Sequence, residues 1–141
     1  MNPNLNSEVL VFKISDQFFA IETSHIKEII EKTETYPLPL DSEHINEILI
    51  FRNEAVGILK SEYYFDIHNT EKNFLIILKD YVAVYADSIG SIIHTAELEQ
   101  GQSDFTPKFI KNIFTLGDKT VFLINYKEVI DNEGHSIILP I

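Results

Sequence analysis

The sequence predicts a mainly β protein, either a small barrel or a sandwich, built from two similar halves. Three observations lead to this prediction: short runs of β-branched and aromatic residues, turn-forming residues between those runs, and a pattern that occurs twice along the chain. At 141 residues, one domain is expected, and a chain of this length buries roughly two-thirds of its unfolded surface. We therefore expect a hydrophobic core that needs no disulfide bonds to support it.

Eight segments are predicted to be strands, because each is short, apolar and rich in Val, Ile, Phe or Tyr. They are Val9–Ile14, Phe18–Glu22, Glu47–Arg52, Ala55–Leu59, Phe74–Leu78, Tyr81–Ala86, Phe109–Leu116 and Thr120–Ile124. The turn residues between successive pairs are Ser15-Asp16-Gln17, Asn53-Glu54, Lys79-Asp80 and Gly117-Asp118-Lys119. Connections this short predict antiparallel hairpins, and several hairpins in succession favour a small barrel or a sandwich.

Two segments are predicted to be short helices. The segment TSHIKEIIEK, which follows Glu22, begins with two residues that can cap a helix and places Ile26, Ile29 and Ile30 on one helical face. Three isoleucines at this spacing make a wide stripe, so we expect Ile26 or Ile29 to be partly exposed; the alternative is a wholly buried stripe. Near the end of the sequence, Asn125–Asp131 is predicted to form the second helix.

The two halves repeat one pattern of strand, turn and strand. EVLVFKISDQFFAIETSHIKEII resembles NFLIILKDYVAVYADSIGSII, and HINEILIFRNEAVGIL resembles KFIKNIFTLGDKTVFLI. Ile26 corresponds to Ile89 and Ile48 to Ile113, at nearly equal offsets (89 − 26 = 63 and 113 − 48 = 65). This period is too long for a solenoid repeat and fits two copies of a small β-unit. The alternative is that any two β-hairpins look alike.

Composition and charge argue against several classes of function. Lys and Arg number 11 and Asp and Glu 22, so the net charge is −11, which repels nucleic acid and anionic lipid. The chain has no cysteine, which suits a reducing cytosol. The first eight residues, MNPNLNSE, lack the features of a secretory signal, and the longest apolar runs are far shorter than the ~20 residues that span a bilayer. We expect a soluble, cytoplasmic protein.

The sequence contains no recognisable catalytic or cofactor motif. The five histidines lie far apart, with no pair at the i, i+4 spacing of a helical metal site. The five glycines form neither a dinucleotide-binding nor a P-loop motif, and no serine lies in a GxSxG elbow. No DxDxDG calcium loop is present. We therefore expect no enzymatic activity, no metal and no cofactor.

Four phrases occur in order along the chain. They are a first phrase at Phe12, Ile14, Phe19, Ala20, Ile21, Glu22, Ile26, Glu28 and Ile29, a linker at Pro37-Leu38-Pro39, a hairpin at Glu47–Gly57, and a step at Ala86-Asp87. Each is an ordinary β phrase, but the ordered set resembles the CheW-like domain of bacterial chemotaxis, from about Glu8 to Asp131. The corresponding family phrases are F-x-L…Y-A-I-D…V-x-E-I, P-L-P, G-V-I-N-L-R-G-x-x-x-P and V-D.

The resemblance implies two small five-stranded, SH3-like β-barrels packed together as one CheW-like domain over residues 1–141. One barrel would consist of approximately residues 8–65 together with the last strand or helix of the chain. The second barrel would consist of approximately residues 66–131, and residues 132–141 would form a tail. It also implies a non-enzymatic adaptor that couples the cytoplasmic tips of methyl-accepting chemoreceptors to a CheA-type histidine kinase. The receptor tip would dock in an apolar groove between the barrels.

An arginine at the end of an apolar strand can simply mark the point where the strand becomes exposed to solvent. The resemblance implies a more specific role for Arg52. Strand alternation would place Arg52 on the same face as Ile48 and Ile50. Glu28 matches the E of V-x-E-I, so we predict a salt bridge between Glu28 and Arg52 beside the groove. The predicted partner-binding residues are Ile26, Glu28, Ile29, Ile48, Arg52, Ile89 and Ile92.

The sequence also departs from the family pattern. In the hairpin phrase, Glu47 and Asn53 stand where the family has glycine. Ile50 stands where the family has asparagine, and Gly57 where it has proline. Asn53 tolerates the positive φ of a tight turn, so the hairpin should survive, whereas Glu47 adds bulk and charge. Two alternatives therefore stay open: a CheW-like adaptor of a pilus or surface-motility branch, and a β-barrel that binds a small apolar molecule.

Overall fold

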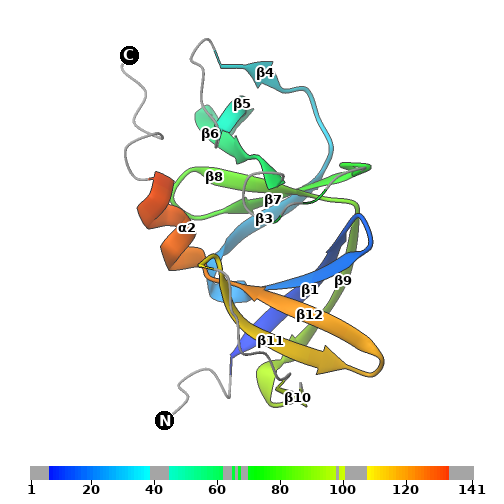
Figure 1. Ribbon diagram of the computed structural model, residues 1–141. Coiled ribbons are helices and arrows are strands. Elements are labelled where there is room, and N and C mark those ends of the chain that lie inside the picture. The colour runs from blue at the N-terminus through cyan, green and yellow to red at the C-terminus, as the bar shows by residue number, and fades with distance from the viewer. Residues whose placement is uncertain are drawn as a thin grey trace.

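The computed structural model describes residues 7–38, 45–61, 65, 67, 70–97, 99–100 and 108–133, and over these residues the chain is mainly β, as predicted (Figure 1). The strands are β1 Glu8–Ile14, β2 Gln17–Glu22, β3 Ile26–Glu31, β4 Tyr36–Pro37, β5 Ile45–Phe51, β6 Glu54–Leu59, β7 Phe74–Leu78, β8 Val82–Ala86, β9 Ser88–His94, β10 Glu99–Gln100, β11 Ile110–Leu116 and β12 Lys119–Ile124. The helical elements that lie wholly within the described residues are the 3-10 turns η1 Thr23–His25 and η2 Thr95–Glu97 and the α-helix α2 Tyr126–Glu133.

The strands form two six-stranded sheets with the same internal order. Sheet A runs β10-β11-β12-β2-β1-β9, and sheet B runs β4-β5-β6-β8-β7-β3. In each sheet one parallel pair, β12 with β2 or β6 with β8, joins strands from different halves of the chain. The predicted repeat is confirmed, since β11 and β12 follow β5 and β6 at one common offset (110 − 45 = 65 and 119 − 54 = 65).

The two sheets are two small SH3-like subdomains packed together, but their strands do not divide at residue 65. Sheet A combines β1 and β2 with β9 to β12, and sheet B combines β3 to β6 with β7 and β8. Each half of the chain therefore gives its first hairpin to the other half's sheet. Each sheet has six strands rather than five, and pairing among the described residues does not close either sheet into a ring.

The prediction of a helix after Glu22 is wrong, whereas the prediction of a helix near the end of the sequence is confirmed by α2. The segment forms the short turn η1 and then the strand β3, which pairs with β7. In β3 the half-buried residues alternate with exposed ones, which is the period of a strand. The β-branched isoleucines favour this outcome, and β7 offers an edge for β3 to complete.

The continuous apolar runs arise because the central strands are buried on both faces. In β1, Leu10 and Phe12 belong to a central core between the sheets, while Val9 and Val11 belong to a separate core inside sheet A. The strands β7 and β8 alternate in the same way between the central core and a core inside sheet B. Such strands lose the alternation of polar and apolar residues, since neither face meets water.

The Asp87 carboxylate ties three segments together at the crossover from β8 to β9. Its Oδ2 accepts a hydrogen bond from the backbone N–H of Ser15 at 2.7 Å. Its Oδ1 accepts the backbone N–H groups of Glu71 at 2.9 Å and Lys72 at 3.0 Å. The Asp87 N–H in turn donates to the Lys13 carbonyl at 2.8 Å. One half-buried side chain therefore fixes the β1–β2 turn of sheet A against the entry to β7 of sheet B.

Helix α2 is held against sheet B by Tyr126. The Tyr126 hydroxyl lies within hydrogen-bonding distance of Asp80 Oδ2, at 2.8 Å, and of the Lys79 carbonyl oxygen. Burial, together with the neighbouring Asp80 carboxylate, raises the pKa of this hydroxyl. The His25 ring stacks on the Tyr126 ring with centroids 4.3 Å apart and an interplanar angle of 12°. Residues of η1, the β7–β8 turn and α2 therefore meet at one point.

We predict that Asp87→Ala destabilises the protein by about 2–4 kcal/mol, because three backbone N–H groups lose a charged acceptor. Urea denaturation measures the free energy of unfolding. The control is Asp118→Ala, which removes the same charge from the exposed β11–β12 turn. Equal losses for the two variants would contradict a special role for Asp87.

We also predict that part of the stability is lost at mildly acidic pH through His25. Burial first, and then Lys111 and Lys79, lower the pKa of His25 below its ordinary 6.5 despite Glu22 and Asp80. The folded state therefore favours neutral His25, and this contribution is present above pH 6.5 and lost as pH falls through the folded-state pKa.

The check is the free energy of unfolding at about pH 7.5 and about pH 5.5 for the wild type and His25→Phe, which keeps the stacked ring. The wild type should lose more stability on acidification than the variant. Identical losses would show that His25 does not contribute to the pH dependence.

Candidate partner-docking surface

The predicted salt bridge between Arg52 and Glu28 is confirmed. Arg52 Nη2 donates to Glu28 Oε1 at 2.8 Å. Lys27 Nζ lies 3.7 Å from Glu54 Oε1 and makes a second bridge nearby. Both pairs join β3 to the β5–β6 hairpin, although β7, β8 and β6 lie between β3 and β5 in the sheet. Sheet B is therefore curled, so that its edge strand β3 approaches the hairpin turn.

Arg52 lies in the hairpin turn and not on the strand, so the expectation that it shares a face with Ile48 and Ile50 is wrong. Phe51 pairs with Glu54, which leaves Arg52 and Asn53 as a two-residue loop. Their φ angles are 51° and 66°, as in a type I′ turn. The hairpin survives the loss of its glycine, as predicted, because asparagine adopts this conformation readily.

Arginine adopts this backbone conformation at a cost, and two contacts hold it there. Besides Glu28, the guanidinium lies 4.9 Å from the centroid of the Phe51 ring. The Arg52 side chain remains 67% exposed and that of Glu28 37% exposed. An exposed pair contributes little to folding, about 0–1 kcal/mol. We therefore expect Arg52→Ala to lower the stability only slightly, since Glu28 stays partly in contact with water.

The isoleucines of the two edge strands are partly exposed at equivalent places. On β3, Ile26 is half-buried against the central core, while Ile29 is 36% exposed. On β9, Ile89 packs against the same core and Ile92 is 59% exposed. The prediction that Ile26 or Ile29 is partly exposed is therefore confirmed. A bulge between Ile26 and Glu28 changes which face each residue takes.

The two edges differ in charge. The offsets of the repeat place Ser91 where β3 has Glu28, and Gly117 where the β5–β6 turn has Arg52 (28 + 63 = 91 and 52 + 65 = 117). Only sheet B can therefore carry this ion pair. Of the predicted residues, the structure brings Glu28 and Arg52 into contact and places Ile26 and Ile29 beside Glu28 on β3.

The remaining predicted residues lie elsewhere. Ile48 lies on β5, and Ile89 and Ile92 lie on sheet A. Sequence reasoning missed other exposed apolar side chains, namely Tyr36, Ile50 and Tyr81. The signal for Ile50 was present, since it alternates with Leu49 and Phe51, which face the core inside sheet B.

Glu47, the substituted glycine, is accommodated by hydroxyl groups. Its Oε2 accepts hydrogen bonds from Thr35 Oγ1 at 2.6 Å and from the Tyr85 hydroxyl at 3.2 Å. Burial, followed by the Glu47 charge, raises the pKa of Tyr85. The Glu47 carboxylate thus has partners of its own on neighbouring segments of sheet B. The departure at residue 47 therefore leaves the Arg52–Glu28 pair intact.

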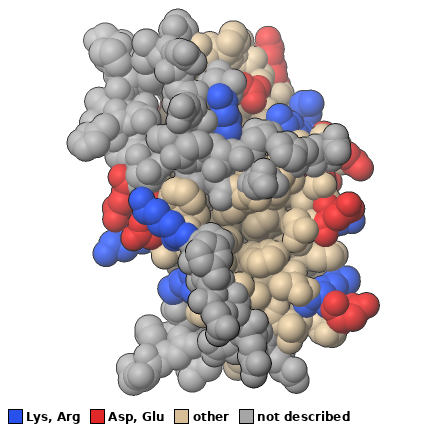
Figure 2. Space-filling view, viewed as in Figure 1, with Lys and Arg blue, Asp and Glu red and all other residues tan. Residues whose placement is uncertain are grey.

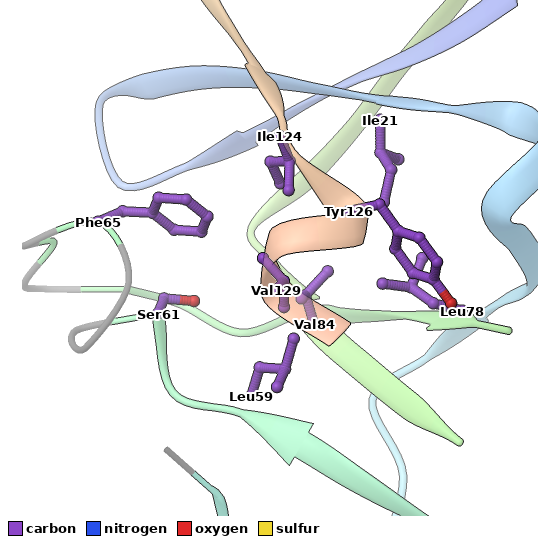
Figure 3. A pocket seen from close by; sticks show the side chains of 9 residues that line it. All are labelled: Ile21, Leu59, Ser61, Phe65, Leu78, Val84, Ile124, Tyr126 and Val129. Carbon is purple, nitrogen blue, oxygen red and sulfur yellow. The ribbon is translucent and has the colours of Figure 1, made fainter. Parts of the chain in front are cut away.

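The interface between the sheets contains a small pocket beneath α2 (Figure 3). Its lining is apolar except for Ser61 and the Tyr126 hydroxyl, and it has room for about one water molecule. The residues that line it are Ile21, Leu59, Ser61, Phe65, Leu78, Val84, Ile124, Tyr126 and Val129. A carrier of small apolar molecules needs a hollow interior of several hundred Å³, so this pocket does not support that alternative.

The described residues contain neither a candidate metal cluster nor a helix that could cross a membrane. No group of three or more His, Asp or Glu side chains in this part of the chain could hold a metal ion. No helix in it is long and apolar enough to cross a membrane.

Comparison with known proteins identifies the family. The family model for the CheW-like domain matches residues 8–134. The crystal structure of the scaffolding protein TtCheW from Thermoanaerobacter tengcongensis superimposes with a TM-score of 0.72 over 85% of this chain and 84% of that one, at 16% sequence identity. No curated protein matches. Because the family model covers nearly the whole chain, this protein belongs to the CheW-like domain family.

Proposed function

We propose that this protein is a non-enzymatic cytoplasmic adaptor that couples methyl-accepting chemoreceptors to a CheA-type histidine kinase. The observation that carries the proposal is the exposed Arg52–Glu28 pair at the edge strand β3, which also presents the exposed Ile29 from its other face, on a CheW-like fold. Glu28 and Ile29 lie on the strand β3, and Arg52 lies in the tight turn between β5 and β6. This arrangement needs no reacting group and suits recognition of a partner.

The docking surface combines an apolar anchor with a fixed charge. Interfaces use arginine as an anchor because its planar guanidinium makes directed hydrogen bonds and packs on rings. Here Glu28 and the Phe51 ring pre-orient Arg52, so little side-chain freedom is lost on binding. An amphipathic helical tip of a receptor would place apolar side chains on Ile29 and a polar group against Arg52.

The distribution of charge supports docking through a neutral surface. The chain carries −11 overall, yet on the face shown in Figure 2 the coloured charged side chains lie mainly toward the sides and uncharged surface occupies the middle. A partner that docks between these charged groups meets few Asp and Glu side chains there. An adaptor of a pilus or surface-motility branch would use the same surface with a different receptor tip.

The test is kinase autophosphorylation in a reconstituted mixture of this protein, a CheA-type kinase and the receptor signalling tips encoded in the same genome. We predict that the wild type raises autophosphorylation and that Ile29→Asp abolishes the increase, because a carboxylate replaces the apolar anchor. Ile29→Asp should fold, since Ile29 is 36% exposed. Ile26→Asp, in contrast, should lower the stability of the protein, since Ile26 packs against the central core.

The control is Thr120→Asp, an equal charge change at an exposed position of β12 on sheet A. It should leave the increase in autophosphorylation unchanged. If the wild type activates no kinase with any tip, or if the isolated chain hydrolyses a substrate, the adaptor proposal fails. Activation with only the tips of a pilus system would assign the protein to that branch.

We further predict that binding depends on the position of the Arg52 charge and not only on its presence. Arg52→Glu and Glu28→Arg should each weaken capture of the receptor tip. Stability should change little, by about 1 kcal/mol or less, because the pair is exposed. The double variant Glu28→Arg/Arg52→Glu rebuilds an ion pair with its polarity reversed.

If Arg52 contacts the partner, the double variant should regain stability but not binding. Capture measured by surface plasmon resonance, together with urea denaturation, separates the two effects. Recovery of binding in the double variant would show that the pair acts only by supporting the turn.

A further inference from the structure

Strand β9 is an exposed edge of sheet A that lacks Lys, Arg, Asp, Glu and Pro. Its sequence is SIGSIIH, and most of its residues are exposed. Its neighbour in the sheet is β1, and no strand of the described residues pairs with its other side (Figure 1). In an antiparallel ladder, every second residue directs its backbone N–H and C=O groups away from the neighbouring strand. These outward groups of β9 can accept a further strand, because neither charges nor proline prevent it.

The other edges of the two sheets are protected. Strand β3, the equivalent edge of sheet B, carries Lys27, Glu28 and Glu31. Lys27 and Glu28 form the ion pairs with the β5–β6 hairpin. The edge strands β4 and β10 have two residues each. Short or charged edges discourage the addition of a strand, so β9 is the long edge among the described strands that lacks this protection.

A cavity of about 170 Å³, here called the β9 cavity, lies between β9 and the β11–β12 turn. Two lysines in its lining lie over one phenylalanine ring, with Lys119 Nζ 4.9 Å and Lys13 Nζ 5.8 Å from the Phe18 centroid. No Asp or Glu is among its described lining residues. Neither lysine forms an ion pair with a described residue. In a chain with 22 acidic and 11 basic residues, the β9 cavity is therefore locally cationic.

Sheet B has an equivalent cavity in which the charges are paired. Lys27 and Glu54 line that cavity, and their Nζ and Oε1 atoms lie 3.7 Å apart. The offset of 63 places Gly90 at the position of Lys27 (27 + 63 = 90). The offset of 65 places Lys119 at the position of Glu54 (54 + 65 = 119). A Cβ at Gly90 would lie 2.7 Å from the Val11 carbonyl oxygen, so the close approach of β1 keeps this side free of a side chain. The unpaired positive charge is thus a feature of sheet A and not of the fold.

The features of the β9 cavity select the chemistry of its occupant. The free strand edge suits an extended backbone, and the two lysines suit a carboxylate. The cavity is smaller than the roughly 300–1,000 Å³ of typical small-molecule sites, so a side chain presented by a peptide fits it better than a separate ligand. A second copy of the chain is disfavoured, because each copy carries a net charge of −11.

We propose that sheet A binds an extended acidic segment of a partner protein, which adds a strand to β9 and places a carboxylate beside Lys13 and Lys119. Strand addition provides affinity through backbone hydrogen bonds, and the β9 cavity provides selectivity through one side chain. The apolar part of the lining, which includes Leu116 and Val121, receives the aliphatic stem of that side chain. The β9 edge belongs to sheet A and the Arg52–Glu28 pair to sheet B, so occupation of this edge does not depend on the proposed function.

The test is a titration of isotope-labelled protein with seven heptapeptides, followed by NMR. Each peptide alternates threonine and valine and has one glutamate, at a different position in each peptide. At least one peptide should shift the amide signals of β9 and slow the exchange of alternate amide hydrogens there, because an added strand covers them. The same peptide with glutamine in place of glutamate should bind at least about three-fold more weakly, because it brings no charge to the lysines.

Variants of the two lysines separate a charge contact from a loss of folding. Lys13→Gln and Lys119→Gln should each weaken binding of the glutamate peptide at least about three-fold and leave binding of the glutamine peptide unchanged. The matched control is Lys108→Gln, because Lys108 Nζ also lies over a phenylalanine ring, 5.5 Å from the Phe109 centroid, but does not line the β9 cavity. This control should bind both peptides as the wild type does.

Three results would overturn the proposal. The first is that no peptide of the set shifts the signals of β9. The second is that benzoate binds as tightly as the best peptide, because the cavity would then be a site for a small carboxylate. The third is protection of the β9 amides that appears without peptide and grows with protein concentration, because a second copy of the chain would then occupy the edge.

Discussion

The exchange of hairpins between the two halves is the constraint on which the rest of the structure depends. Hairpin β1–β2 completes sheet A through its parallel pair with β12, and β7–β8 completes sheet B through its pair with β6. Neither half can therefore form its sheet alone. The exchanged strands also separate the three cores, since alternate residues of β1 and β7 face the central core and a sheet core. Loss of register in either hairpin would move a whole row of side chains to the wrong core.

The exchange also explains why the candidate site has its position. After β2 the chain leaves sheet A through the turn η1 and enters sheet B as strand β3. Strand β3 pairs there with the exchanged strand β7. The side chains of β3 then meet the β5–β6 turn, where Arg52 and Glu28 join. The same route in the second half brings β9 to the edge of sheet A, but Ser91 and Gly117 provide no charges there. A nearly symmetric fold thus carries an ion pair on sheet B that has no counterpart at the equivalent positions of sheet A.

Much of this could be predicted from the sequence, and the limits have physical causes. The hairpins and α2 were predictable because turn residues and short-range periodicity are local properties. The segment after Glu22 was assigned to a helix because caps and isoleucine spacing fit one, but pairing with β7 decided otherwise. The exchange was not predictable, since any apolar strand can pair with any other and the choice is made by long-range packing. The Arg52–Glu28 contact was predictable only through the family resemblance, as 24 residues separate the two.

Residue 52 has a backbone conformation whose cost exceeds what its side-chain contacts contribute within the fold. The turn requires a positive φ, which costs roughly 1–3 kcal/mol for a residue such as arginine and little for glycine or asparagine. The surface ion pair contributes less than this. Folding alone would therefore favour glycine at position 52, followed by the asparagine already present at position 53. Glu28 and Phe51 stabilise the arginine but do not offset the whole cost of its backbone conformation, which agrees with the proposal that its guanidinium contacts a partner.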